Sequence, residues 1–265
     1  MNVLQGKKGL IMGVANEKSI AWGVAELAHE NGAELAFSYQ GEMLKKRVEP
    51  LANSIGCNDL YECDVQNDES IEKLFKDVEA KWGTLDFVVH SIAFSDKNEL
   101  RGHFSDTTRA NFKLSMDVSC YSFIAVTKYA QKLMPKGGSL ITMTYYGSEK
   151  VVPNYNVMGV AKAALECATR YLAMDLGEKN IRVNSVSAGP MRTLASAGIG
   201  DMKLILDYNQ QQSPLKKNVS LEEVAGCSVF LLSDLSNGIT GENIHVDAGY
   251  HIVGVPKKAK VEGEE

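Results

Sequence analysis

Short, mostly apolar runs alternate with helix-length amphipathic stretches along nearly the whole chain, and this alternation restricts the possible folds more than any other feature of the sequence. The stretch at residues 70–81 is an example, because Ile71, Leu74, Phe75 and Val78 recur at the spacing of one helix face. Short apolar runs between such stretches are typical of strands that are buried on both faces. We expect these strands at residues 9–12, 34–38, 60–63, 87–90, 139–143, 182–186 and 243–246.

Seven strands separated by helices predict one parallel, doubly wound α/β sheet with helices on both faces. The clearest further helices are expected at residues 20–30, at about 42–54 and after Pro153-Asn154. No linker or repeat interrupts the pattern, so we expect a single domain over residues 1–255. Residues 256–265 are charged, lack apolar periodicity, and are expected to form a flexible tail.

The composition argues against several classes of partner. A net charge of -5 gives no bulk attraction to nucleic acid or to an anionic membrane. No apolar stretch reaches the roughly 18 residues that a membrane-spanning helix needs, and the N-terminal apolar run is too short for a signal peptide. The five cysteines are well separated and form no CxxC pair, which favours free thiols in a reducing compartment over disulfides or a metal site. We therefore expect a cytoplasmic protein without nucleic-acid partners, membrane insertion or a bound metal.

The loop after the first expected strand has features of a phosphate-binding turn. Gly13 follows the strand directly, and Ser19 is placed to cap a helix that begins at Ile20. A helix N-terminus at the carboxyl end of a strand presents free N–H groups and a positive dipole to a pyrophosphate. The loop lacks the GxGxxG pattern, so a tight turn before a capped helix is an equally good interpretation of this loop alone.

Polar and small residues also follow the next three expected strands, at the edge where ligands gather in such sheets. Gln40 stands where many NAD-binding folds carry an acid for the adenosine ribose, and its amide can also bond a ribose hydroxyl. No arginine follows it immediately to bind a 2′-phosphate, although residues 45–47 are basic, so NADH is favoured over NADPH. The residues expected to contact this cofactor are Gly13, Ser19, Ile20, Gln40, Asp64, Val65, Ser91, Ile92 and Ala93.

Two residues that can carry chemistry, Tyr155 and Lys162, follow the fifth expected strand. The helix expected after Asn154 carries both, and their seven-residue spacing places them on one face, about 10 Å apart along the axis. Taken singly, a half-buried packing tyrosine and a solvated lysine would be the simpler interpretation. Their position beside the carboxyl end of a central strand favours a catalytic pair.

The segment from Ser148 to Glu166, which includes PNYNVMGVAKA at residues 153–163, resembles the active-site segment of bacterial enoyl-acyl-carrier-protein reductases. These enzymes are divergent, Rossmann-like members of the short-chain dehydrogenase superfamily. The resemblance covers nearly the whole chain, through motifs at residues 4–7, 13–23, 90–94, 187–195 and 246–249.

The tyrosine–lysine spacing separates this family from ordinary short-chain dehydrogenases. Those enzymes place the catalytic tyrosine four residues before the lysine, and a serine thirteen residues before the tyrosine. Counting back from Lys162, the tyrosine position (162 − 4 = 158) holds Met158 and the serine position (158 − 13 = 145) holds Tyr145. A carbonyl reductase would lack its proton donor here, so the spacing argues against alcohol or ketone chemistry.

The resemblance implies that the chain uses NADH to reduce the trans-2 double bond of enoyl thioesters on acyl carrier protein, in fatty-acid elongation. Hydride adds to the β-carbon, Tyr155 donates a hydrogen bond to the enolate oxygen, and Lys162 holds the cofactor by its nicotinamide ribose. Tyr145 is expected to line the acyl pocket and to help position the thioester. The resemblance also implies a homotetramer, and a flap at residues 194–210 that orders over the acyl chain.

Further contacts are carried over from the same resemblance. The additional cofactor contacts are Ala188, Gly189, Pro190, Met191 and Thr193. The additional acyl-pocket residues are Ser95, Met158, Ile199 and Met202. Lys203, Lys216 and Lys217 are candidates for docking an acidic carrier protein.

Two other interpretations stay open at this point. One is a short-chain reductase that acts on another enone or on a carbonyl with NADPH, and the tyrosine–lysine spacing argues against it. The other is a cofactor-binding regulatory protein without catalysis, which we would expect to have lost Tyr155 or Lys162.

Overall fold

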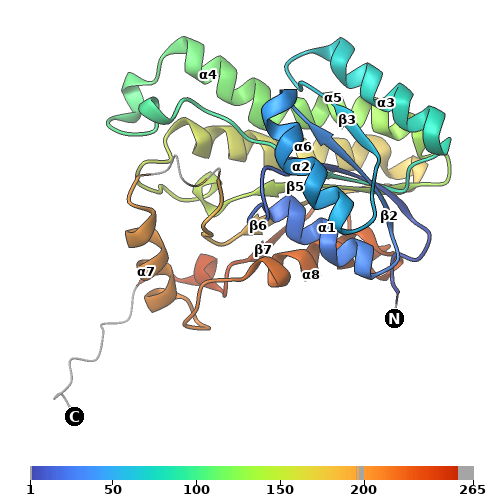
Figure 1. Ribbon diagram of the computed structural model, residues 1–265. Helices are drawn as coiled ribbons and strands as arrows, with labels where there is room; N and C mark the ends of the chain where they lie inside the picture. Colours follow the sequence, from blue (N-terminus) through green and yellow to red (C-terminus); the bar gives the residue numbers. More distant parts are fainter. Residues whose placement is uncertain (1, 195, 197–199, 256–265) are drawn as a thin grey trace.

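The structure, a computed structural model, describes residues 2–194, 196 and 200–255, and the expected tail at residues 256–265 lies outside them. The strands are β1 (Lys8–Met12), β2 (Glu34–Tyr39), β3 (Leu60–Glu62), β4 (Phe87–His90), β5 (Gly138–Thr144), β6 (Ile181–Ala188) and β7 (Asn243–Val246). They form one parallel sheet in the order β3-β2-β1-β4-β5-β6-β7, which runs through the centre of the molecule in Figure 1. The strand order reverses between β1 and β4, so the prediction of a doubly wound, Rossmann-like sheet is confirmed.

Helices cover both faces of this sheet (Figure 1). They are α1 (Ile20–Glu30), α2 (Gly41–Ser54), α3 (Asp68–Trp82), α4 (Arg109–Met116), α5 (Ser122–Ala130), α6 (Val157–Leu176), α7 (Met202–Gln212) and α8 (Leu221–Leu232). α1, α2 and α8 bury Trp22, Val48 and Val224 in the core on one face. α3 and α5 bury Ile71 and Phe123 in the core on the other face, where α6 also packs. Within the described part of the chain, no helix is long and apolar enough to cross a membrane.

The strands are apolar because their side chains serve both cores. Successive residues of a strand point to opposite faces of the sheet. In β1, Ile11 belongs to the core beneath α1, whereas Leu10 and Met12 belong to the core beneath α3. All three side chains are fully buried, so neither face of this strand tolerates a polar residue.

The start of α6 differs from the prediction in a way that affects the site. The helix begins at Val157, so the expectation that it carries Tyr155 as well as Lys162 is wrong. Tyr155 lies in the turn before the helix, between Asn154 and Asn156, whose φ angles are 61° and 36°. Helical residues need a negative φ, and therefore the helix cannot include Tyr155.

Candidate active site

A cavity of about 1090 Å³ lies at the carboxyl end of the sheet. Segments that follow six strands line it: Gly13 after β1, Gln40 after β2, Asp64 after β3, Ser91 after β4, Tyr145 after β5 and Gly189 after β6. This is the edge at which doubly wound sheets bind ligands. The fold therefore brings segments that are far apart in the sequence together around one cavity.

Nearly all of the site residues that were predicted from the sequence line this cavity. Ser19 is buried but does not line it, and Ile199 lies outside the described residues. The predicted residues that do line it are Gly13, Ile20, Gln40, Asp64, Val65, Ser91, Ile92, Ala93, Ser95, Tyr145, Tyr155, Met158, Lys162, Ala188, Gly189, Pro190, Met191, Thr193 and Met202.

The loop after β1 closes through Ser19 and makes an exceptionally close contact through Gly13. The Ser19 hydroxyl accepts hydrogen bonds from Ala15 N (3.0 Å) and Asn16 N (3.1 Å), and it makes no side-chain bond to the first turn of α1. Ser19 is the N-cap residue of α1, as predicted, but its side-chain oxygen closes the loop and does not bond the first turn of the helix. Gly13 has a φ of +102°, and a Cβ there would lie 2.1 Å from the Ser91 carbonyl oxygen. Only glycine permits this approach of β1 to β4 beside the cavity.

We expect Gly13→Ala to destabilise the protein by about 3 kcal/mol or more, because the methyl group combines a positive φ with a backbone clash. The free energy of unfolding, measured by denaturant titration, tests this. Gly6→Ala is the matched control: Gly6 has a φ of +71°, and a Cβ there would meet nothing within 4 Å. Equal losses in the two variants would contradict the clash and leave only the cost of the positive φ.

Tyr155 is packed from two sides by the segment that follows β5. Its ring meets the Tyr145 ring edge-on, with the centroids 5.1 Å apart and the planes at 77°. A Cβ on Gly147 would lie 2.5 Å from the Tyr155 ring, so the backbone of Gly147 touches the ring directly. Tyr155 is only 7% exposed, and this packing fixes the ring at the wall of the cavity.

Both phenols are neutral hydrogen-bond donors at physiological pH. Burial raises the pKa of Tyr155 far above its usual range, and the neighbouring Tyr145 and Glu166 raise it further. Burial also raises the pKa of Tyr145 to about 12, with smaller contributions from Tyr250 and Asp247. A buried phenol that keeps its proton is suited to donate a hydrogen bond to a developing negative charge.

Lys162 brings a buried ammonium group to the lining of the same cavity. It is 6% exposed, and its Nζ donates to the Met143 carbonyl oxygen at 2.7 Å. Burial lowers the pKa of Lys162 to about 8, while the nearby Glu166 and Cys120 act in the opposite direction. An ammonium group has three N–H donors, so two are left for a ligand in the cavity. A buried, incompletely bonded ammonium beside a large cavity fits the hydroxyl groups of a bound ribose.

The model of the family described as "Enoyl-(Acyl carrier protein) reductase" matches residues 13–251 of the chain. The chain belongs to this family. Among its relatives, the "Enoyl-[acyl-carrier-protein] reductase [NADH] 1" of Rhizobium meliloti is 57% identical over 253 residues, which are 96% of this chain and 93% of the relative. The "Enoyl-[acyl-carrier-protein] reductase [NADH] FabI" of Rickettsia felis is 55% identical over 96% of this chain and 98% of that protein.

Solved structures of enoyl reductases have the same fold as this family member. The crystal structure of FabI from Candidatus Liberibacter asiaticus has a TM-score of 0.95 and 54% identity, over 97% of this chain and 100% of that one. The enoyl reductase of Anaplasma phagocytophilum, solved in complex with NAD, has a TM-score of 0.93 and 55% identity, over 96% of this chain and 97% of that one.

His90, in one of the motifs shared with the enoyl reductase family, is a structural residue. It is completely buried, with Nε2 2.9 Å from the Ser122 hydroxyl and Nδ1 3.2 Å from the Thr142 hydroxyl. Burial, together with the charge of Lys162, lowers the pKa of His90 to about 3. The imidazole therefore stays neutral, and it does not line the cavity.

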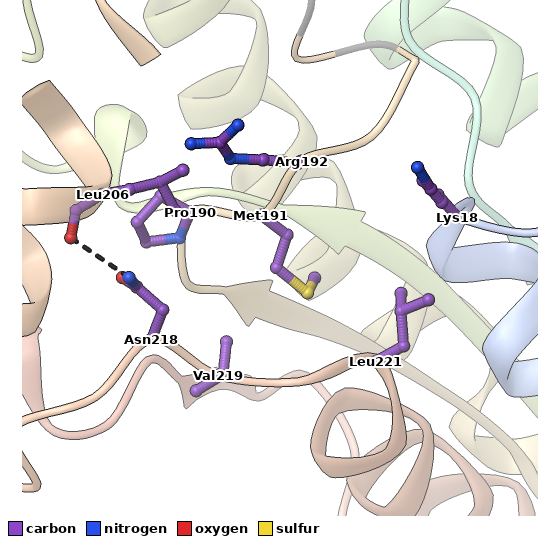
Figure 2. A pocket seen from close by; sticks show the side chains of 8 residues that line it. All are labelled: Lys18, Pro190, Met191, Arg192, Leu206, Asn218, Val219 and Leu221. Carbon is purple, nitrogen blue, oxygen red and sulfur yellow. Dashed lines mark hydrogen bonds between the residues drawn. The ribbon is translucent and has the colours of Figure 1, made fainter. Parts of the chain in front are cut away.

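This enoyl reductase family member has a second, smaller cavity of about 310 Å³ that shares Pro190 and Met191 with the large one (Figure 2). Arg192 and Lys18 reach it from two sides, and Asn218 Nδ2 donates to the Leu206 carbonyl oxygen at 3.1 Å. Among the described residues, its lining contains neither a tyrosine nor a carboxylate. The buried phenols and the buried ammonium group thus lie at the large cavity.

Several apolar residues of the large cavity were missed in the sequence. Val118 lies in a π-helical turn (Asp117–Tyr121) between α4 and α5, and Leu114 lies in α4. Neither stands near a motif, and both reach the cavity where α4 and the π-helical turn pack against α6. Phe94 ends the family motif at residues 90–94, so a local signal was present although the residue was not assigned to the cavity.

Proposed function

We propose that the chain reduces the trans-2 double bond of enoyl thioesters on acyl carrier protein with NADH, in fatty-acid elongation. The observation that carries the proposal is that Tyr155 and Lys162 both line one cavity, with Met158 where a carbonyl reductase would have its tyrosine. Membership of the enoyl reductase family and the NADH named in its relatives support the same reaction.

The residues around the cavity fit a nicotinamide dinucleotide. The close approach at Gly13 and the N-terminus of α1, near Ile20, suit a pyrophosphate. Gln40 lies where the adenosine ribose would be held. Lys45, the first basic residue of α2, has its Nζ 3.8 Å from the Glu42 carboxylate, which weakens its attraction for a 2′-phosphate. This arrangement favours NADH over NADPH.

Bound NADH supplies the hydride, which adds to the β-carbon of the enoyl thioester. Negative charge then develops on the thioester oxygen, and we assign the hydrogen bond to that oxygen to Tyr155. Such a donor stabilises the transition state more than the ground state, typically by about 3 kcal/mol. Lys162 holds the cofactor's ribose, and Tyr145 keeps the Tyr155 ring in place through their edge-on contact.

The apolar part of the cavity suits a fatty acyl chain. Met158 and Met202 contribute flexible side chains that adapt to chains of different length. Phe94 and Leu100, from the connection between β4 and α4, and Ile205, from α7, extend this surface. We propose that the segment at residues 194–210 covers the chain, as the family resemblance implies.

The test of this function is consumption of NADH with a series of 2-enoyl thioesters, run beside NADPH and a 3-ketoacyl thioester. We expect turnover of the enoyl thioesters with NADH and none of the ketoacyl thioester. Turnover of the ketoacyl thioester alone would contradict the proposal. No turnover of any substrate would favour a cofactor-binding regulatory protein without catalysis.

We further propose a homotetramer, a cytoplasmic location and a single catalytic domain over residues 1–255 followed by a tail. The outward face of α6 supports the assembly, because apolar residues recur on it at the 4-3-4-3 spacing of a helix–helix seam. They are Val160, Ala164, Cys167, Tyr171 and Met174, of which Tyr171 is 72% and Met174 82% exposed.

We expect the double variant Tyr171→Asp, Met174→Asp to dissociate the assembly, because it places charges in an apolar seam. Molar mass from light scattering should fall below that of the tetramer. Val151→Asp is the control, since Val151 is 98% exposed and lies outside the helix. An unchanged mass in the α6 variant would show that this face is not an interface.

The carrier protein is the proposed macromolecular partner. Of the three candidate docking lysines, two are already engaged within the chain. Lys217 pairs with Glu223, and Lys216 Nζ donates to the Gln211 carbonyl oxygen at 2.6 Å. Lys203, on α7 beside the cavity, is therefore the strongest docking candidate of the three.

A further inference from the structure

A buried carboxylate, Glu166, lies behind the wall that carries Tyr155 and Lys162. It stands one helical turn after Lys162 on α6 and is 9% exposed. Its Oε1 accepts a hydrogen bond from the Thr144 hydroxyl at 2.6 Å and another from the Ser148 hydroxyl at 2.5 Å. Glu166 does not line the cavity, so it acts on a ligand only through its neighbours.

The two hydroxyl donors enclose the segment that packs against Tyr155. Thr144 ends β5, Ser148 lies four residues later, and Tyr145 and Gly147 stand between them. Tyr145 meets the Tyr155 ring edge-on, and the backbone of Gly147 touches the same ring. One carboxylate oxygen thus binds both ends of the turn, and the middle of the turn packs against Tyr155, the proposed hydrogen-bond donor.

Glu166 also lies close to Lys162 on α6 and has the opposite charge. Residues four apart on a helix are neighbours, about 6 Å between their Cβ atoms. The other titratable groups around Lys162 are His90 on β4, which is neutral, and Cys120 in the π-helical turn. Glu166 is thus the strongest influence that favours the ammonium form of Lys162 against burial.

We propose that Glu166 is a positioning residue for the reaction: its carboxylate holds the Thr144–Ser148 turn against Tyr155, and its negative charge keeps Lys162 protonated. The inference rests on the proposed function, because the roles of Tyr155 and Lys162 come from that function. Replacement of the carboxylate by an amide should separate the two effects. The glutamine oxygen can still accept the two hydroxyl bonds, while the charge is lost.

The experiment measures the dissociation constant of NADH and kcat/KM as functions of pH for the parent and for Glu166→Gln. In the parent, the dissociation constant of NADH should rise and kcat/KM should fall as Lys162 loses its proton, around pH 8. In Glu166→Gln the midpoint should fall by about one pH unit, which makes kcat/KM about tenfold lower on the alkaline side. The two proteins should converge at low pH, where Lys162 is protonated in both.

Ser148→Ala is the matched control, because it removes one hydrogen bond to Glu166 and keeps the charge. We expect a lower kcat with the midpoint unchanged, since Tyr155 is less well held. Glu166→Asp keeps the charge on a shorter side chain, and should behave as Ser148→Ala does. Glu166→Asp also tests the inference if Glu166→Gln fails to fold.

An unshifted midpoint in Glu166→Gln would overturn the charge role, and an equal shift in Ser148→Ala would assign the effect to geometry alone. Unchanged kcat in both Ser148→Ala and Glu166→Asp would overturn the role in holding the turn. Failure of the proposed function is distinguishable from these results. It would appear as a parent that binds NADH with a measurable pH midpoint but turns over no enoyl thioester.

Discussion

Replacement of Tyr155 by phenylalanine is expected to lower kcat by about 100-fold or more, and to leave the affinity for NADH within about threefold of the parent. The ring keeps its edge-on contact with Tyr145, so the packing of the wall is retained. Only the hydroxyl is lost, and with it the hydrogen bond to the oxygen that gains negative charge. Steady-state turnover of an enoyl thioester and fluorescence titration of NADH measure the two quantities.

Tyr145→Phe is the control for this prediction, because it removes the neighbouring phenol hydroxyl from the same wall. We expect a smaller loss of kcat, since Tyr145 acts through its ring. Near-normal turnover in Tyr155→Phe would remove the assigned donor role. A larger loss in Tyr145→Phe than in Tyr155→Phe would transfer that role to Tyr145.

The second large effect is expected from Lys162→Met, which should weaken NADH binding by about 10- to 100-fold. The ammonium group has two N–H donors beyond the one bonded to Met143, and a hydrogen bond from a charged donor contributes about 1.5–3 kcal/mol. Methionine fills nearly the same volume as the lysine stem, so no large hole is left in the wall. Calorimetric titration of NADH measures the loss.

The thermal stability of the same variant separates a ligand-binding role from a structural one. Burying an ammonium is costly, but its removal leaves the buried carboxylate of Glu166 without the opposite charge beside it. We therefore expect Lys162→Met to lose NADH affinity and to melt at a temperature no higher than that of the ligand-free parent. A large drop in melting temperature with unchanged NADH affinity would contradict the assignment and make Lys162 a structural residue.

The sheet was predictable from the sequence because burial on both faces leaves a strong local signal. Leu10, Ile11 and Met12 are apolar since each meets one of the two cores, and the same holds along β4. Helix boundaries depend on single side chains and were less predictable. α3 begins at Asp68, two residues before the expected start, because the Asn67 side chain accepts hydrogen bonds from two backbone N–H groups of its first turn.

The residues around the cavity were predictable where they follow a strand or belong to a motif, as Gly13 and Lys162 do. The position of Tyr155 outside α6 was not, because it depends on positive φ angles at two asparagines that helical spacing does not reveal. Glu166 was also missed. A glutamate within a helix is usually solvated, and only tertiary packing shows that this one receives two buried hydroxyl groups.

The most direct test of the proposed reaction is to find which carbon of the product receives the hydride. The protein is supplied with NADH that carries deuterium on the reactive carbon of the nicotinamide, together with a 2-enoyl thioester, and the saturated product is examined by NMR and mass spectrometry. We predict one deuterium at the β-carbon and a proton from the solvent at the α-carbon. Deuterium at the α-carbon, or on the carbon of the thioester carbonyl, would contradict conjugate reduction and the role assigned to Tyr155.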